Sequence, residues 1–169
     1  HGLPRVTRSA LAPSPDAGAI DAEVRALVGA GAPLYELCEA SIAGLRPDVI
    51  LTQALCRVCA VSEHDVRALA ARLDPSPRVV AFAGTTLEGV LADIAFVAGA
   101  LGRTDAAHGL LGELRDRMRH VHETLKSARA PRPRAAVIEW YDPLYVAGHW
   151  VPDVVRPAGE MRRPALARR

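Results

Sequence analysis

Aromatic residues are scarce in this chain. Its 169 residues include only two phenylalanines, two tryptophans and three tyrosines. Both tryptophans and two of the tyrosines nevertheless lie in one short stretch, IEWYDPLYVAGHWVPDVV at 138–155. A cluster of this kind in a chain so poor in rings indicates either a local core or a surface on which a ligand stacks.

The sequence also lacks long apolar runs, a signal sequence and an even number of cysteines. No run of roughly eighteen apolar residues occurs, so the sequence predicts no transmembrane helix. The opening residues HGLPRVTRSALAPSPD lack the charged-then-apolar pattern of a signal sequence and are typical of a loop. Three cysteines, Cys38, Cys56 and Cys59, argue against a disulfide framework because one of them has no partner.

Charge of one sign is in slight excess only. The net charge of +2 is too small to argue for a nucleic-acid partner, and a composition that is 50% hydrophobic and 24% charged is that of an ordinary globular chain. The length suits one domain, or one and a half domains of a larger two-lobed protein. Arginines gather in residues 156–169, for which we expect a basic, disordered tail.

Apolar periodicity and turn residues predict helices that alternate with strands. Helical spacing occurs at 20–31, 41–45, 62–73, 85–101 and 104–128, with a further short helix from Pro152. Runs rich in branched residues predict strands at 34–38, 49–53, 78–82 and 135–140. This order predicts an α/β chain with a largely parallel sheet.

One of the predicted helices begins with a sequence close to a capping box at Ser62, and another begins with a capping box at Thr85. Ser62 is followed by Asp65, and Thr85 by Glu88, so each hydroxyl is expected to accept a hydrogen bond from the third residue of its helix. Gly102 is expected to end the second of these helices.

The cysteine pair is the first candidate for chemistry. Cys56 and Cys59 form a Cys-x-x-Cys pair after a predicted strand, which is compatible with half of a zinc site or with a redox pair. Only Cys38 and His64 are available nearby as further ligands. A packed loop of small residues is therefore the preferred interpretation, and the sequence predicts no metal site.

Signals of enzyme chemistry are weak. The sequence has neither a nucleophile elbow nor a phosphate-cradling glycine loop, and Glu139 with Asp142 is a poor candidate for a pair of acids. His120 and His122 lie two apart on a helix and so point to different faces. His149, in the aromatic cluster, either contacts a ligand or caps a turn. We therefore predict a protein that is not an enzyme and has no catalytic residues.

The aromatic residues themselves favour ligand binding or sheet closure about equally. Trp140 and Tyr141 are adjacent in a predicted strand, so they cannot both face a core. A loop at the carboxyl end of a parallel strand is where open α/β sheets bind ligands, and aromatic faces suit a large, flat molecule. The alternative is that two of the four rings close the end of the sheet.

Two long segments resemble one protein family. LYELCEASIAGLRPDVILTQALCRVCAVSEHDV (34–66) and EWYDPLYVAGHWVPDVV (139–155) are similar to ABC-transporter substrate-binding proteins for cobalamin (vitamin B12) and iron–siderophore complexes, above all to the cobalamin-binding branch. The resemblance covers roughly residues 3–155. It implies a helix-linked, two-lobe periplasmic-binding-protein fold of the class III type. The first lobe would occupy 1–103, the connecting helix 104–129 and the start of a second lobe 134–155.

The resemblance also implies a function. A protein of this family binds a corrinoid between its lobes in the periplasm and delivers it to a permease of the inner membrane, with no cofactor of its own and no nucleic-acid partner. By position, the ligand loops would be 53–61 and 142–150. The implied ligand-binding residues are Gln53, Leu55, Tyr145, His149 and Trp150, and Glu63 is the implied carboxylate for permease docking.

Three alternatives stay open. The same fold could hold an iron–siderophore or haem, or the Cys56–Cys59 pair could define a metal-binding or redox domain. The third alternative is a non-functional fragment, because by the family pattern the chain is truncated at both ends. The family's opening strand would precede residue 1, and most of the second lobe would follow residue 155.

Overall fold

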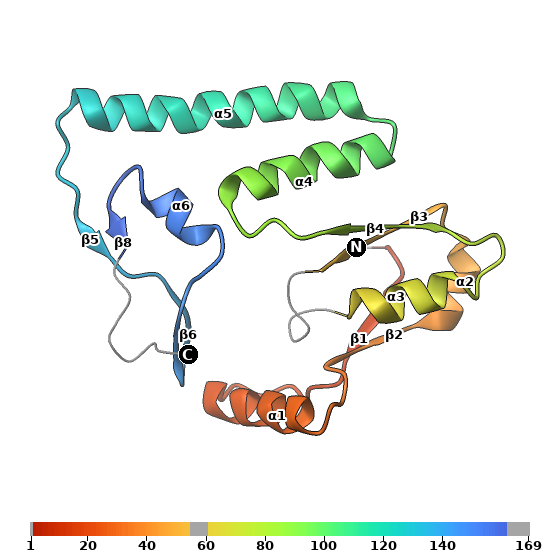
Figure 1. Ribbon diagram of the computed structural model, residues 1–169. Coiled ribbons are helices and arrows are strands. Elements are labelled where there is room, and N and C mark those ends of the chain that lie inside the picture. Colours follow the sequence, from red (N-terminus) through yellow and green to blue (C-terminus); the bar gives the residue numbers. More distant parts are fainter. Residues whose placement is uncertain (1, 55–60, 162–169) are drawn as a thin grey trace. The chain divides into compact units, whose positions relative to one another are not determined.

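The computed structural model describes residues 2–54 and 61–161 (Figure 1). The chain divides into two compact units, His1–Ala83 and Gly84–Arg169. Each unit mixes helices with strands, as the sequence predicted for an α/β chain.

The first unit contains four strands and three helices. In chain order they are β1 (Thr7–Ser9), α1 (Ala17–Gly29), β2 (Tyr35–Leu37), α2 (Glu39–Leu45), β3 (Val49–Gln53), α3 (Glu63–Ala70) and β4 (Arg78–Phe82). The predicted strands and helices of this unit are all present, and β3 and β4 have the predicted bounds. Their runs of branched side chains are those that a buried strand favours.

Strand β1 corrects the prediction that the opening residues form a loop. It pairs antiparallel with β2, with Thr7 opposite Leu37 and Ser9 opposite Tyr35. Arg8 donates to the Glu36 carboxylate across this pair at 2.7 Å. That hydrogen bond, together with the charge of Glu36, raises the pKa of the Arg8 guanidinium. The strand exists because a partner far along the chain completes its hydrogen bonds, which local propensity does not report.

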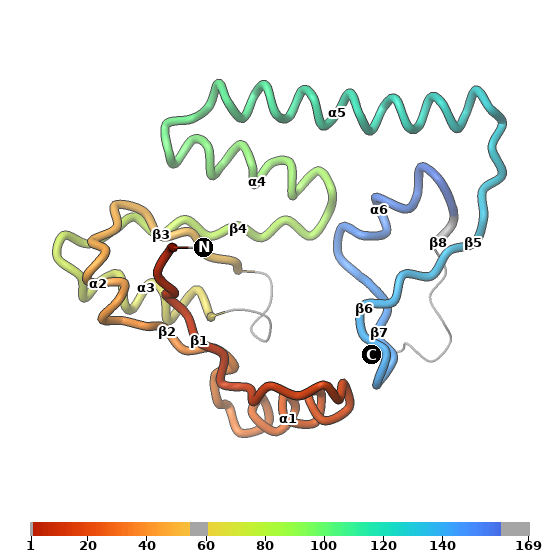
Figure 2. The backbone as a smooth tube through the Cα atoms, turned by 180° about the vertical axis from the view of Figure 1, so that it is seen from behind, coloured from red at the N-terminus to blue at the C-terminus, as the bar shows by residue number. Residues whose placement is uncertain are grey.

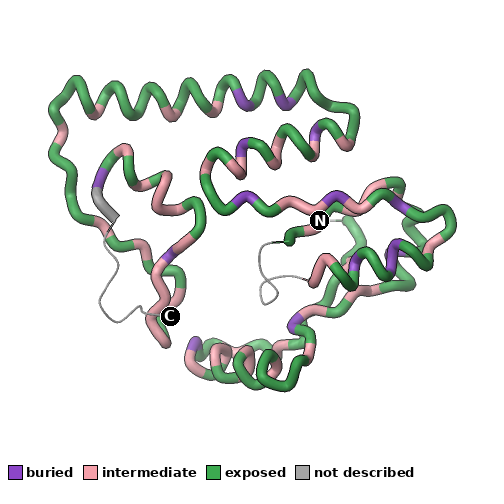
Figure 3. The backbone as a smooth tube through the Cα atoms, viewed as in Figure 1, coloured by how far each residue is buried: buried purple, intermediate pink, exposed green. Residues whose placement is uncertain are grey.

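The core of the first unit lies where α3 packs on the parallel pair β3–β4. Val66 and Leu69 from α3 and Val80 from β4 are each at most 4% exposed, as the burial colouring of Figure 3 shows for these elements. Ser62 accepts a hydrogen bond from the Asp65 amide at 3.1 Å and begins α3, which confirms the predicted cap.

The second unit begins with two helices and continues with short strands. In chain order they are α4 (Leu87–Ala100), α5 (Thr104–Ser127), β5 (Arg134–Ala135), β6 (Ile138–Tyr141), β7 (Leu144–Val146), α6 (Val151–Val155) and β8 (Glu160–Met161). Helix α5 has 24 residues, close to the predicted 104–128, and is therefore about 36 Å long. Pro131 and Pro133 follow it, as expected.

Helices α4 and α5 form an antiparallel hairpin, which Figure 2 shows from behind. Gly102, with φ +64°, ends α4 as predicted. Leu91 and Ala98 from α4 pack with Ala107 and Leu111 from α5, and all four are at most 9% exposed. This contact is the main apolar core of the second unit.

The start of α4 differs from the prediction by one residue. Thr86, not Thr85, is the N-cap, and its hydroxyl accepts from the Gly89 amide at 3.0 Å. Gly84 fits tightly against the first turn and donates its amide to the Asp93 carboxylate at 2.7 Å. This close approach fixes where the chain enters the helix, and sequence spacing alone does not contain it.

The prediction of a largely parallel sheet was wrong. Within residues 2–54 and 61–161 the strands pair only two by two: β3–β4 and β5–β8 are parallel, whereas β1–β2 and β6–β7 are antiparallel. The strand predicted at 135–140 is divided into β5 and β6. Residues 160 and 161, within the expected basic tail, pair with β5.

Candidate functional site

The aromatic cluster is built on a β-hairpin. Strands β6 and β7 pair antiparallel, with Trp140 opposite Tyr145 and Tyr141 opposite Leu144, and a cis Asp142–Pro143 peptide in the turn. We call residues 138–146 the aromatic hairpin. The prediction of a loop over 142–150 was wrong at Tyr145, because this residue lies in strand β7. The missed signal was Asp-Pro between two strand-forming runs, IEWY and LYV, because that dipeptide favours a turn.

The rings of the hairpin lie at its surface. Tyr141 is 71% exposed and Ile138 is 58% exposed, while Trp140 and Tyr145 are half-buried. The prediction that Trp140 and Tyr141 cannot both face a core is thus confirmed. Their ring centroids are 6.4 Å apart with 21° between the planes, an offset stack.

Trp140 is oriented by a hydrogen bond. Its indole Nε1 donates a hydrogen bond to the carbonyl oxygen of Asp142 at 2.8 Å, so the side chain lies toward the turn. The pairing register also shifts between Ile138 and Trp140. A shift of this kind breaks the strict alternation of side chains between Ile138 and Trp140 and bends the strand locally.

The segment after the hairpin carries the other two predicted ligand residues. His149 is exposed and has φ +49°, a left-handed conformation that places it in the turn before α6. Trp150 is 43% exposed, and its carbonyl accepts the Asp153 amide at 3.0 Å at the start of α6. Both residues are accessible, and their contact with a ligand stays a prediction.

Asp153 connects this segment to α4. Its Oδ2 accepts the Leu87 amide at 3.0 Å, and its Oδ1 lies 2.9 Å from the Arg156 guanidinium. A carboxylate at the first turn of a helix stabilises the free amides and the positive end of the helix dipole. Sequence reasoning did not find this contact, which joins residues 66 positions apart.

The predicted residues of the first unit lie at the end of a strand and at the start of a helix. Gln53 is the exposed last residue of β3, and Glu63 is the first residue of α3. The Glu63 carboxylate lies 2.7 Å from the Arg67 guanidinium, and its side chain is 33% exposed. Leu55, like Cys56 and Cys59, lies outside the residues that the structure describes.

Metal-binding clusters and membrane-spanning helices are absent from the described part of the chain. No group of three or more histidine, cysteine or acidic side chains among them could hold a metal ion. Cys38 is a half-buried free thiol. No helix of this part of the chain combines the length and the apolar character needed to cross a membrane.

Comparison with known proteins gives structural matches only. No protein-family model matches the sequence, and no curated protein matches it. The solved structures that share its fold include a periplasmic haem-binding protein from Pseudomonas aeruginosa, with 19% identity and a TM-score of 0.55. An ABC transporter substrate-binding protein from Listeria monocytogenes EGD-e has 15% sequence identity to this chain and a TM-score of 0.53. The periplasmic haem-binding protein RhuT from Roseiflexus sp. RS-1, in apo form, has 20% sequence identity and a TM-score of 0.57.

The coverage of these matches is uneven. The alignments take in 74%, 78% and 75% of this chain but only 46%, 49% and 47% of the three structures. The chain therefore has the α/β fold of the class III periplasmic binding proteins and spans just under half of their length.

Proposed function

We propose that this chain forms part of the solute-binding component of an ABC importer, with the aromatic hairpin as one of its ligand-binding surfaces. The observation that carries the proposal is the exposed ring of Tyr141, 71% accessible and stacked beside Trp140. The fold shared with solved periplasmic binding proteins supports the same function.

Physical chemistry favours a broad, flat ligand for this surface. Ile138 and Tyr141 leave large apolar areas in water, and covering such area stabilises a complex by about 25 cal/mol per Å². Offset stacking on an aromatic ring adds about 0.5–1.5 kcal/mol. An exposed aromatic patch on a fixed hairpin thus suits a macrocycle better than a small polar solute.

Two ligands fit this description. A corrinoid is the first candidate, because the sequence resembles the cobalamin-binding branch of the family. Haem is the second candidate, because two of the three solved structures above are described as haem-binding proteins. The proposed contacts are Tyr141 of the aromatic hairpin and the residues that the resemblance implies, which are Gln53, Leu55, Tyr145, His149 and Trp150. An iron–siderophore is a third ligand of the same family.

Permease docking is proposed for Glu63. In an importer of this kind the protein works outside the cytoplasm and meets its permease through charged groups on the lobe surfaces. The Glu63–Arg67 pair does not prevent this, because intrahelical surface pairs contribute only about 0.3–0.5 kcal/mol. An incoming arginine of the permease can replace Arg67 at small cost.

Tryptophan fluorescence tests the ligand directly. The 169-residue chain would be titrated separately with cyanocobalamin and with haemin, and with free N-acetyltryptophanamide as a control for light absorption by the ligand. We expect saturable quenching with one of the two ligands, because Trp140 and Trp150 are the only tryptophans of the chain. Emission that follows the free-tryptophan control with both ligands would show that the chain binds neither macrocycle.

A histidine substitution distinguishes the two ligands. Protein-bound haem iron commonly takes an axial side-chain ligand, and the exposed His149 can supply one. If haem is the ligand, His149→Ala should weaken binding at least about tenfold, or about 1.4 kcal/mol, and shift the Soret band. The control His120→Ala removes an exposed histidine from α5 and should change neither. If cobalamin is the ligand, His149→Ala should weaken binding less than this, because it removes a contact and not an iron ligand, and His120→Ala should again change nothing.

A further inference from the structure

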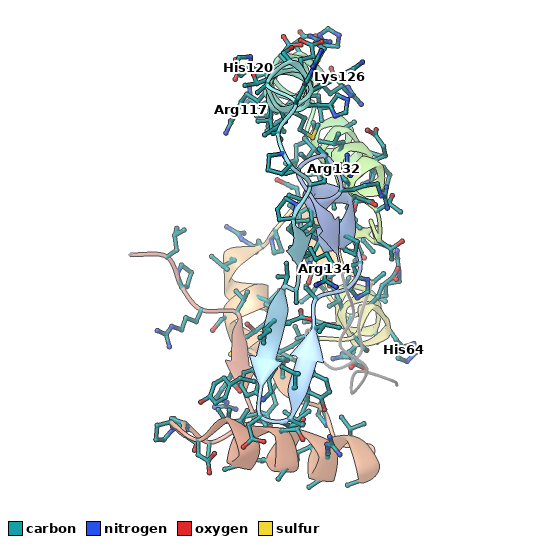
Figure 4. All side chains as sticks on the ribbon, turned by 90° about the vertical axis from the view of Figure 1, so that its left-hand side faces the viewer. His64, Arg117, His120, Lys126, Arg132 and Arg134 are labelled. Carbon is teal, nitrogen blue, oxygen red and sulfur yellow. The ribbon has the colours of Figure 1, made fainter. Side chains whose placement is uncertain are left out.

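A basic cavity of about 280 Å³ lies at the carboxyl end of α5. Its walls come from the last turn of the helix, from residues 129–132 and from the turn after α6. Figure 4 labels Lys126 on α5 and Arg132 in the segment that follows the helix. The cavity lies wholly within the second unit and shares no residue with the aromatic hairpin.

Four basic side chains line this cavity, and no carboxylate does: His122, Lys126, Arg129 and Arg132. Among the residues that the structure describes, Lys126 and Arg129 form no ion pair. The Arg132 guanidinium donates to the carbonyl oxygens of Gly159, at 3.2 Å, and Arg156. These two bonds hold Arg132 in place but leave its positive charge unneutralised.

Cations at a helix carboxyl end have an ordinary structural role, which is not enough here. They offset the helix dipole, which is equivalent to about half a negative charge at this end. Lys126 alone, in the last turn of α5, is sufficient for that. The charges of Arg129 and Arg132 remain in excess at the cavity.

The backbone at Arg129 gives an independent reason to assign a function to this cation. The Ala130 amide donates to Leu125 and the Arg129 amide to Lys126, so α5 ends in a Schellman motif. Arg129 occupies its left-handed position with φ +48°, as Arg46 does after α2, whereas the ends of α1 and α4 carry glycine. A left-handed arginine is strained because its Cβ crowds the following carbonyl oxygen, and strained backbone conformations gather at functional sites.

We infer that the cavity binds a phosphate-type oxyanion attached to a small organic body. Guanidinium and ammonium groups bind phosphate through short, charge-assisted hydrogen bonds, and arginine does so with two parallel donors. The volume leaves room beyond a single oxyanion. Apolar atoms of Leu125, Pro131 and Pro157 line the remaining wall and suit the organic part of the ligand.

Calorimetry with pyrophosphate tests whether this site binds a phosphate-type anion. Sedimentation with vesicles then distinguishes a soluble phosphorylated ligand from a lipid headgroup. The 169-residue chain would be titrated with pyrophosphate at low ionic strength and sedimented with phosphatidylglycerol or phosphatidylcholine vesicles. We expect one saturable site for the anion. The double substitution Lys126→Gln/Arg129→Gln should lower its affinity at least tenfold, and Lys126→Arg should retain it. Circular dichroism checks that each variant is folded.

The matched control removes the same charge elsewhere on the same helix. Arg103→Gln/Arg117→Gln alters the N-cap of α5 and a residue within it, two exposed arginines that do not line the cavity, and should change the affinity less than twofold. Anion binding by pyrophosphate alone indicates a soluble phosphorylated ligand. Selective binding of phosphatidylglycerol vesicles that the cavity variant abolishes indicates a lipid headgroup.

Two results would overturn the inference: no binding of pyrophosphate or anionic vesicles, or an equal loss of affinity in the cavity variant and the control. The second result would mean that the anion responds only to overall charge. Neither tryptophan lines the cavity, so failure of the macrocycle titration leaves this test unaffected.

Discussion

Among the described residues, left-handed residues end four helices, and their side chains differ. Gly31 follows α1 with φ +67° and Gly102 follows α4 with φ +64°, whereas Arg46 follows α2 with φ +44° and Arg129 follows α5 with φ +48°. Glycine adopts this conformation without steric cost, whereas a side chain meets the following carbonyl oxygen. Arg129 is thus a position at which the chain is less stable than its fold allows.

Replacing Arg129 with glycine should therefore stabilise the second unit. Relief of the left-handed strain exceeds the entropy lost by adding a glycine, so we expect a gain of about 0.5–1 kcal/mol in the free energy of unfolding. The midpoint of urea unfolding, followed by helical circular dichroism, measures it. The reverse control Gly102→Arg should lower the midpoint by a comparable amount. A lower midpoint for Arg129→Gly would contradict this reading of the helix end.

Helix caps were predictable where they depend on a few neighbouring residues and not where they depend on a contact. Ser62 and Gly102 were predicted correctly because capping and helix termination depend on a few neighbouring positions. Thr85 was predicted wrongly because two threonines are adjacent and both could cap the helix. The choice of Thr86 depends on Gly84 packing against the helix, which is a contact and not a pattern.

At the scale of elements, Gly84 lies very close to the first turn of α4. A Cβ atom on Gly84 would lie 2.6 Å from backbone atoms of Gly89 and Val90. Those backbone atoms belong to the first turn of α4 and cannot rotate aside. The absence of a side chain at Gly84 therefore allows the residue to lie against the first turn of α4.

Gly84→Ala should destabilise the second unit by about 1–3 kcal/mol, the usual cost of inserting a group into a packed site. The matched control is Gly112→Ala, because a Cβ at Gly112 in the middle of α5 would meet nothing within 4 Å. That control should stabilise the protein by about 0.5–1 kcal/mol, as alanine favours a helix. The two unfolding midpoints should thus move in opposite directions. Equal shifts would refute the close packing at Gly84.

Strands and helices were predictable to different degrees. Helices α3, α4 and α5 and strands β3 and β4 follow from local periodicity and branched side chains. Strand β1 and the aromatic hairpin do not, since short strands exist only through their partners. Division of the strands into pairs also escaped prediction, because alternation of elements indicates the α/β class but not the extent of a sheet.

For the whole molecule, the family resemblance and the structural matches agree on the fold. Long motifs at 34–66 and 139–155 predicted the class III periplasmic-binding-protein architecture, which solved structures of under 25% identity share. The candidate site was predictable in its residue types, since the rarity of aromatics marked residues 138–155. Its geometry was not, because a two-residue turn, a register shift and the Trp140 hydrogen bond set the ring positions.

The central claim is that the aromatic hairpin holds a broad macrocycle, and one comparison of dissociation constants tests it most directly. Tyr141→Ala removes an exposed hairpin ring, and Phe96→Ala removes a ring of 50% exposure from α4 in the same unit. With whichever of cyanocobalamin or haemin binds the parent chain, Tyr141→Ala should weaken binding about tenfold, or about 1.4 kcal/mol, and Phe96→Ala should leave it unchanged. Equal affinities for the two variants, or loss of binding only in Phe96→Ala, would contradict the account.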